Sequence, residues 1–221
     1  MFERASLYRI LPFGAYIFFL IATDVLERFG WSAHELRWLY AVRIFVVAVL
    51  ILALHKTYVE LRLPAVVRMR DWVIAVVAGV VVFVLWIKLN AGWMTIGTPA
   101  GFDPTEADGI DWWMVAVRLA GAALVVPVME ELFWRSFLMR WFARQDFLAV
   151  EPARVGLQAF AITAVFFAFE HNLWLAGLVA GVVYNLLYMR SGNLWTAVLA
   201  HAVTNALLGV WVVATGSWSY W

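Results

Sequence analysis

Long apolar stretches recur along this chain and are separated by short polar connections. A helix that crosses a bilayer needs about 20 mostly apolar residues, and backbone polar groups cannot stay unpaired in lipid. We therefore predict an all-α fold, a polytopic transmembrane helical bundle of about seven spans, or eight. The predicted spans are Tyr8–Thr23, Leu39–Leu54, Trp72–Leu89, Trp112–Met129, Leu157–Phe169, Leu173–Met189 and Leu194–Ala214.

Composition supports one membrane domain over residues 1–221. Charged residues make up 14% of the chain and hydrophobic residues 65%, whereas soluble domains carry about 25% charged residues. The lipid bilayer is thus an expected partner, and the net charge of +1 argues against nucleic acid. The absence of cysteine excludes disulfides, thiolate metal sites and a cysteine nucleophile. We expect residues 1–111 to form the N-terminal spans and an outer loop, and residues 112–221 to carry the ionisable groups.

The fourth apolar segment is predicted to extend past Met129. A helical pattern continues through Glu130, Glu131 and Arg135 to about Arg144, without a glycine or proline to break it. This helix would carry two adjacent carboxylates deep into the bundle.

Basic residues predict the orientation. The loop Asn90–Asp111 holds four acidic residues and no lysine or arginine. Cytoplasmic loops carry the excess of lysine and arginine, so we expect a cytoplasmic N-terminus and an outer C-terminus. The basic residues then assigned to the cytoplasmic side are Arg4, Arg9, Lys56, Arg62, Arg68, Arg70, Arg135, Arg140, Arg144, Arg154 and Arg190.

A few polar side chains fall within the apolar segments of the second half. A charge at bilayer depth costs at least about 2.5 kcal/mol, so each is a candidate functional group. Glu131 and Arg135 are four residues apart and can pair on one helix face, while Glu130 lies about 100° round the helix. One carboxylate would be held by Arg135 and the other left free to react. The candidates are Glu130, Glu131, Arg135, His171, His201 and Asn205.

Helix rise predicts the depth of these groups. Glu130 lies about 21 Å along the helix from Arg144, and His171 lies about 24–26 Å along the next helix. The helical hairpin therefore brings Glu130 and His171 to nearly the same level. His201 and Asn205 lie about 12 and 18 Å above the turn before the last span. They reach that level if the turn over residues 144–154 protrudes about 10 Å further into the cytoplasm.

Two carboxylates and two imidazoles at one level predict either a divalent-metal site or an acid–base site. Zinc binds histidine nitrogen and carboxylate oxygen, and a catalytic zinc keeps one position for water. A metal or a glutamate base would activate that water, and an asparagine amide or histidine N–H could stabilise an oxyanion. These groups describe hydrolysis of an amide bond inside the membrane. The chain has no HExxH motif, which excludes zincin-type metalloproteases.

Three motifs in order carry a family resemblance. Glu130-Glu131-Leu-Phe-Trp-Arg135 is similar to EExxxR, Phe167-Ala-Phe-Glu-His171 to FxxxH, and His201-Ala-Val-Thr-Asn205 to HxxxN. Together they resemble the CAAX prenyl protease and bacteriocin-processing family, CPBP or Abi, over about residues 118–208. The whole chain further resembles CAAX prenyl protease-related proteins that accompany exosortase protein-sorting systems in bacteria.

This resemblance implies an intramembrane endopeptidase, with residues 112–221 as its catalytic core. It implies that Glu130 and His171 activate water, that His201 and Asn205 stabilise the oxyanion or complete a metal site, and that Glu131 and Arg135 orient the site. The cofactor is one divalent metal, zinc held by Glu130, His171 and His201, or none. The expected location is the bacterial inner membrane, with the active site open to the cytoplasm. The expected substrate is a membrane-associated protein or peptide, whether prenylated or not, and the oligomeric state is left open.

Other interpretations stay open. The chain could be a non-enzymatic immunity or assembly factor of a sorting system. A small transporter would require an inverted repeat, which the sequence does not show. Gly177 and Gly181 form GxxxG, which predicts close helix packing. Arg43 and Arg118 are expected to snorkel or pair, and Glu170 to face outward.

Overall fold

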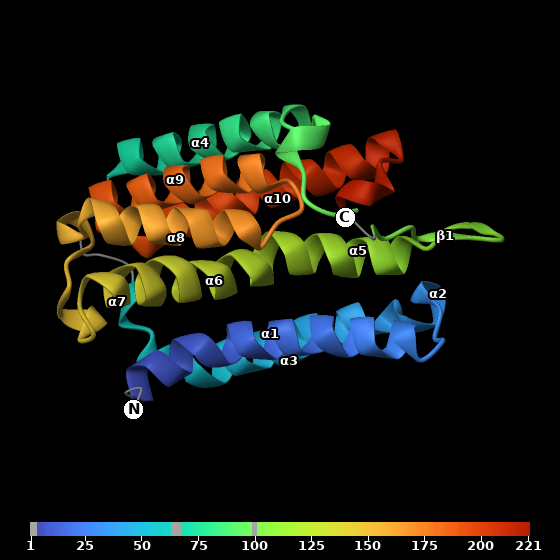
Figure 1. The fold of residues 1–221 in the computed structure, drawn as a ribbon, viewed down its shortest axis with the longest axis horizontal. Helices are drawn as coiled ribbons and strands as arrows, with labels where there is room; N and C mark the ends of the chain where they lie inside the picture. The colour runs from blue at the N-terminus through green and yellow to red at the C-terminus, as the bar shows by residue number, and fades with distance from the viewer. Residues whose placement is uncertain (1–3, 63–67, 99–100) are drawn as a thin grey trace.

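The computed structural model describes residues 4–62, 68–98 and 101–221, and these are mostly helical (Figure 1). The helices are α1 (Arg4–Arg28), α2 (Ala33–Leu36), α3 (Trp38–Leu54), α4 (Met69–Lys88), α5 (Trp112–Ala120), α6 (Val126–Glu131), α7 (Met139–Ala143), α8 (Leu157–Phe169), α9 (Trp174–Ser191) and α10 (Leu194–Thr215). Short 3₁₀ turns cover His55–Thr57, Val59–Leu61, Gly92–Met94, Phe147–Ala149, Pro152–Arg154 and Trp218–Tyr220. The predicted all-α class is confirmed.

Each predicted span coincides with a helix. Five helices of the described chain are long and apolar enough to cross a membrane, namely Arg4–Arg28, Ala33–Thr57, Met69–Lys88, Trp112–Ala143 and Leu194–Thr215. The protein is therefore an integral membrane protein. The remaining two predicted spans are α8, a shorter apolar helix of 13 residues, and α9. Together they form a hairpin that differs from the full-length spans.

The long helix over residues 112–143 confirms the predicted continuation past Met129, and it ends at Ala143. It is not a uniform α-helix, because Gly121–Val125 and Leu132–Leu138 form π-helical turns on either side of α6. Pro127 has no backbone N–H, so the carbonyl of Ala123 loses its ordinary helical partner. Short π segments inside α-helices are frequent at functional sites.

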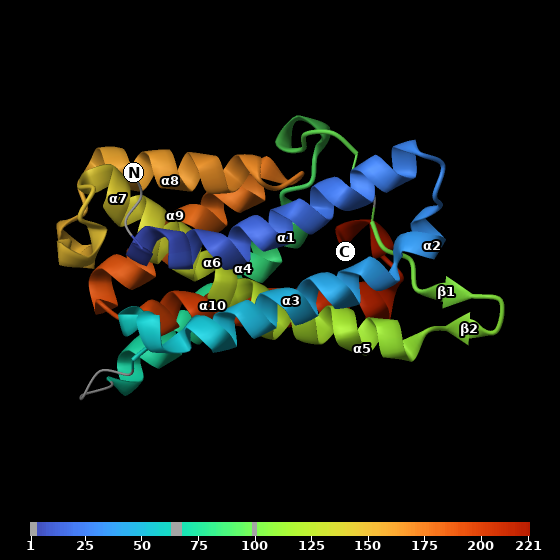
Figure 2. The ribbon, with the colours of Figure 1, turned by 90° about the horizontal axis from the view of Figure 1, so that it is seen from below.

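The long helix runs through the middle of the bundle (Figures 1 and 2). The α1–α3 pair packs on one side of it, while α4, α8, α9 and α10 lie on the other. In that second layer α10 packs against both α4 and α9, and α8 packs against α9. Polar side chains of the long helix can therefore face either layer.

Small residues allow the close approach of α8 and α9. A Cβ at Gly177 would lie 3.2 Å from the Cα of Ala168, and one at Gly181 would lie 3.1 Å from the Cα of Ala164. The GxxxG pair thus packs directly against a neighbouring helix backbone, as predicted. This contact sets the position of His171, which follows α8.

The loop between α4 and α5 is less irregular than its glycines and prolines predict. It contains an antiparallel pair, β1 (Thr105–Glu106) and β2 (Gly109–Ile110). Gly109 has a φ of +121°, a backbone conformation that glycine adopts without strain. Glu106 forms an ion pair with Arg37 next to α2, which fixes the hairpin at this end of the bundle.

Candidate active site

One cavity of about 530 Å³ gathers most of the predicted site residues. It is lined by residues of α1, α3, α4, the long helix, the α8–α9 hairpin and α10. Glu130, His171, His201 and Asn205 all line it. The four candidates, which come from the long helix, the end of α8 and α10, thus share one cavity. Glu131 and Arg135 are not among the lining residues and lie behind the cavity wall.

Glu131 is the centre of a buried polar network. Its Oε1 accepts a hydrogen bond from Arg135 Nη1 at 3.1 Å and another from His201 Nδ1 at 2.9 Å. The side chains of Glu131 and Arg135 are 0% exposed. The pairing of Glu131 with Arg135 follows from helix spacing, whereas the bond to His201 joins two helices and was not predicted. The network therefore ties the EExxxR helix to the HxxxN helix.

Asn185 on α9 extends this network and is a residue that the sequence interpretation missed. Arg135 Nε donates to Asn185 Oδ1 at 3.1 Å, and Asn185 Nδ2 donates to the carbonyl of Phe160 at 3.2 Å. Asn185 is fully buried in an otherwise largely apolar helix. A buried amide in such a helix is a recognisable signal, because each of its polar atoms needs a partner. Asn185 therefore orients Arg135 from outside the three motifs.

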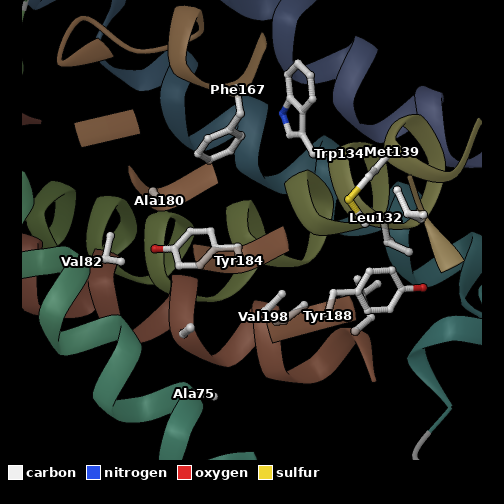
Figure 3. Packing of buried hydrophobic residues seen from close by; sticks show 14 of the residues in the cluster. Ala75, Val82, Leu132, Trp134, Met139, Phe167, Ala180, Tyr184, Tyr188 and Val198 are labelled. Carbon is white, nitrogen blue, oxygen red and sulfur yellow. The ribbon is translucent and has the colours of Figure 1, made fainter. Parts of the chain in front are cut away.

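Aromatic side chains enclose the same network. The guanidinium of Arg135 lies 4.1 Å from the ring centroid of Phe167, which is the first residue of the FxxxH motif. The ring of Tyr184 stacks on His201 with centroids 5.0 Å apart. Phe167, Tyr184 and Trp134 belong to one buried apolar cluster (Figure 3). These contacts exclude water from the inner side of the site.

Glu130 has a different environment from its neighbour Glu131. Oε2 is buried without a hydrogen-bond partner among the described residues in both carboxylates, but Glu131 accepts two hydrogen bonds at Oε1. Glu130 is 5% exposed and lines the cavity, which Glu131 does not. The prediction of one held and one open carboxylate is met in the geometry.

In both histidines the same ring nitrogen, Nδ1, is bonded to an acceptor within the protein. His171 Nδ1 lies 2.8 Å from the carbonyl oxygen of Phe167, and His201 Nδ1 lies 2.9 Å from Glu131. Because these partners are acceptors, Nδ1 carries the proton in both rings. Nε2 is then the nitrogen of each ring that is available to water or substrate.

Asn205 and its neighbour Thr204 fix α10 in place. Asn205 Nδ2 donates to the carbonyl of Ala122 at 2.9 Å, which leaves the second amide N–H of Asn205 for another acceptor. Thr204 accepts from the hydroxyl of Tyr184 at 2.8 Å and donates to the carbonyl of Gly79 at 2.9 Å. The depth and rotation of α10 are thus set by polar contacts to three other helices.

Two charged residues differ from their expected roles. Glu170 was expected to face outward, but it lines the cavity and accepts a hydrogen bond from Trp134 Nε1 at 2.9 Å. Glu170 follows the last residue of α8, where the chain turns toward α9, and this turn brings its side chain to the cavity. Arg118 also lines the cavity, 4.7 Å from the ring centroids of Tyr40 and Phe102. Arg118 was expected to snorkel or pair, and it instead packs against aromatic faces in the cavity wall.

The lining residues do not form a metal-ligand cluster. Within residues 4–62, 68–98 and 101–221, no three histidine, aspartate or glutamate side chains are arranged to hold a metal ion. Nδ1 of His201 bonds to Glu131 and Nδ1 of His171 bonds to the carbonyl of Phe167, so only Nε2 of each ring could bind a metal. Zinc held by Glu130, His171 and His201 stays a prediction.

A comparison with known families matches the same half of the chain. The family model of type II CAAX prenyl endopeptidase, Rce1-like, matches residues 112–207, which contain all three motifs and Asn185. No curated protein and no solved structure matches the chain. The matched region begins at the first residue of α5 and ends within α10, so it contains every residue of the Glu131 network. This match places residues 112–207, the part of the chain that carries the three motifs, in the CAAX prenyl endopeptidase family.

Proposed function

We propose that this protein hydrolyses a peptide bond of a membrane-associated protein or peptide, with Glu130 as the general base. One observation carries the proposal: Glu130, a buried glutamate with an unpartnered carboxylate oxygen, lines a cavity shared with two histidines and an asparagine. A buried carboxylate is costly unless something binds it, so an open one in a cavity wall is suited to hold a water molecule.

In the proposed reaction, Glu130 takes a proton from a water molecule while the water oxygen bonds to the carbonyl carbon of the substrate. Nε2 of His171 accepts a second hydrogen bond from the same water and orients it. Glu130 then gives its proton to the amide nitrogen as the carbon–nitrogen bond breaks. General acid–base catalysis of this kind contributes roughly 10²–10⁴-fold to a rate.

Asn205 and His201 are suited to stabilise the oxyanion. The free N–H of the Asn205 amide can donate to the carbonyl oxygen as it gains charge. His201 can donate from Nε2 when it is protonated, and the Glu131 carboxylate then balances its charge. Arg135 and Asn185 act as positioning residues, because Arg135 holds Glu131, Asn185 holds Arg135, and neither lines the cavity.

The test uses the whole protein in membranes and assumes no particular substrate. Membranes with the parent chain, Glu130→Gln or His171→Ala are compared by mass spectrometry for newly formed peptide termini. We expect a set of new peptide termini that forms only when both Glu130 and His171 are intact. Glu151→Gln and His55→Ala are matched controls, since Glu151 and His55 are exposed, and both should keep those termini.

Termini that are the same in all these membranes would rule out the proposed role of Glu130. Cleavage that is lost on chelation and restored by zinc would favour the metal alternative, with the ligands rearranged from the present geometry. A function kept by the motif variants but lost on changes to surface loops would favour the non-enzymatic immunity or assembly factor.

We further propose that the protein works in the bacterial inner membrane beside an exosortase sorting system. The similarity of the whole chain to the CAAX prenyl protease-related subgroup supports this proposal. Deletion of the gene should then leave sorted proteins with an uncleaved segment, which their molecular mass would show. Unchanged masses would contradict the link and leave the peptidase proposal intact.

A further inference from the structure

We infer that the basic end of the bundle binds the phosphate headgroup of an anionic phospholipid, at a site separate from the catalytic cavity. The basic end is the end at which α4 and α10 begin, and its connections carry Arg62, Arg68, Arg144, Arg154 and Arg190. A second cavity, of about 580 Å³, lies there between the α3–α4 connection and the turn that joins α9 to α10. Among the described residues none lines both cavities, so an occupant of the second one would leave the catalytic cavity free.

Positive charge dominates the lining of this second cavity. Three arginines line it without an ion pair or a side-chain hydrogen bond in the described chain, and they are Arg62, Arg68 and Arg190. The acids of the lining are Glu60 and Asp71, and Glu60 is already bound by Arg9 and Arg140. Three guanidinium groups therefore share the cavity with one carboxylate that lacks a basic partner, that of Asp71. Guanidinium groups bind phosphate oxygens through two parallel N–H donors, so the lining is suited to phosphate.

Two long helices begin at the same cavity. The first residues of α4 and of α10 contribute to its lining, and the two helices pack against each other from this end (Figure 1). The N-terminus of a helix is equivalent to about half a positive charge. Asp71 offsets that charge in the first turn of α4, whereas the first turn of α10 contains no acidic residue. The N-terminus of α10 therefore adds to the attraction of the arginines for an anion.

Hydrogen bonds hold the walls of this cavity in place. Trp195 Nε1, in the first turn of α10, donates to the carbonyl of Leu61 at 2.8 Å, which places Arg62 beside that turn. Asn193 Oδ1 accepts from the N–H of Trp195 at 3.1 Å, and the N–H of Asn193 donates to Ser191 Oγ at 3.0 Å. The α9–α10 turn and the α3–α4 connection are thus fixed to each other. A ligand that meets such preset walls needs to order few protein groups on binding.

The neighbouring surface favours a lipid over a free phosphate ion. Trp72 lines the cavity in the first turn of α4, and the side chains of Val73 and Val77 are 54% and 55% exposed. Tryptophan is enriched at the boundary between headgroups and acyl chains, and exposed valines of a spanning helix contact lipid. A headgroup in the cavity can therefore keep its acyl chains along α4. Basic pockets between transmembrane helices are recurrent binding sites for anionic headgroups.

The test measures lipid binding by the full-length protein in detergent. Native mass spectrometry counts the bound lipid molecules and gives the affinity for phosphatidylglycerol, with phosphatidylcholine of the same acyl chains as the comparison without net charge. Arg62→Gln and Arg190→Gln each remove one guanidinium from the cavity. Arg70→Gln is the matched control, because Arg70 is an exposed arginine in the first turn of α4 that does not line the cavity.

We expect the parent to bind phosphatidylglycerol more tightly than phosphatidylcholine. Arg62→Gln and Arg190→Gln should each weaken that binding by about tenfold or more, since each removes a charge-assisted contact to phosphate. Arg70→Gln should bind like the parent. Without lipid the unfolding temperatures of all three variants should equal that of the parent, because these side chains are exposed.

Equal losses of affinity in all three variants would overturn the site, since the basic end would then attract anions without a specific cavity. Equal binding of phosphatidylcholine would overturn the role of charge. Displacement of phosphatidylglycerol by millimolar inorganic phosphate would overturn the lipid as occupant and indicate a site for the free ion. Lipid binding requires no proteolysis, so these outcomes are independent of the Glu130→Gln test of the reaction.

Discussion

Two buried glutamates show how differently this protein uses one side chain. Glu60, beside the basic end, accepts hydrogen bonds from Arg9 Nε at 3.0 Å and Nη2 at 2.6 Å, from Arg140 Nη2 at 3.0 Å and from the Ser136 hydroxyl. Glu130, in the cavity wall, has an oxygen without any partner in the described chain. We call the first group the paired cluster and the second, with His171, His201 and Asn205, the cavity set.

This difference separates a polar cluster that stabilises the fold from one that is placed to react with a bound molecule. The paired cluster satisfies its carboxylate and joins α1, the turn at Val59–Leu61 and the long helix. The cavity set leaves Glu130 open at a place that a small molecule can reach. A buried ion pair that loses one partner leaves a costly charge, whereas an already open carboxylate loses little folding energy when it is neutralised. The two glutamates should therefore respond oppositely to the same substitution.

The largest expected effect is on catalysis by the cavity set. Glu130→Gln should lower the rate of cleavage by roughly 10²–10⁴-fold, because the general base is removed. Its thermal unfolding should stay close to that of the parent, since the lost oxygen has no partner in the fold. Initial rates and unfolding curves of the purified protein in detergent measure both. A variant that unfolds early would mean that Glu130 supports the fold instead.

Glu60→Gln should have the opposite effect. Arg9 and Arg140 would keep buried charges with less compensation, and breaking such a pair costs about 3–5 kcal/mol of stability. Activity per folded molecule should not change, because Glu60 does not line the catalytic cavity. Chemical denaturation in detergent measures the stability.

Glu151→Gln is the control for Glu60→Gln. Its ion pair with Arg154 is 66% exposed on the glutamate side, and exposed pairs contribute about 1 kcal/mol or less. Equal losses in Glu60→Gln and Glu151→Gln would remove the distinction between the paired cluster and an ordinary surface pair.

A smaller effect is expected for Asn185, which belongs to the hydrogen-bond network of Glu131 behind the cavity set. Asn185→Ala should lower kcat by up to about 100-fold, since a small misplacement of the site has an effect of that size. KM should change little, because Asn185 does not line the cavity. Asn185→Asp offers rescue, since a carboxylate can still accept from Arg135. A purely structural role would instead lower the amount of folded protein and leave kcat unchanged.

The smallest effect is the pH dependence of the paired cluster. Burial alone would raise the pKa of Glu60, but the hydrogen bonds and charge of Arg9 and the Ser136 hydroxyl outweigh it and hold that pKa below its ordinary value of 4.5. A carboxyl with a lowered pKa stabilises the fold above its unfolded pKa, and this stability is lost as the pH falls through the folded pKa.

The parent protein should therefore lose stability below about pH 4.5, and Glu60→Gln should lose less over the same range. Melting temperatures of both proteins from about pH 7 to about pH 3 measure the difference. Parallel curves would show that Glu60 does not titrate differently in the folded and unfolded states.

Much of the site could be predicted from local patterns. The apolar segments coincide with helices, and the spacing of Glu131 and Arg135 placed them on one face. Constant helix rise brought Glu130 and His171 to one level, and both line the cavity. These predictions work because hydropathy, rise and i,i+4 geometry are properties of a single helix.

Patterns within one helix could not predict the contacts between helices. His201 lines the cavity with Glu130 and His171, as expected, but its bond to Glu131, 70 positions away in the chain, was not predicted. Asn185 bonds to Arg135 across 50 positions, and the paired cluster joins residues up to 80 positions apart. Apolar helices such as α8 and α10 have no polar face to predict their rotation, so packing alone decides which side chains meet.

The sequence by itself therefore determined the membrane class, the long helix over residues 112–143 and the candidate site residues, because each depends on composition or on spacing along one helix. The tertiary structure decided that Glu131 also bonds His201 on another helix, and to which end of the bundle the cavity leads. Those outcomes depend on helix rotation, on close packing at glycine and on the length of the α8–α9 hairpin relative to its neighbours, and these are set only when the helices pack together.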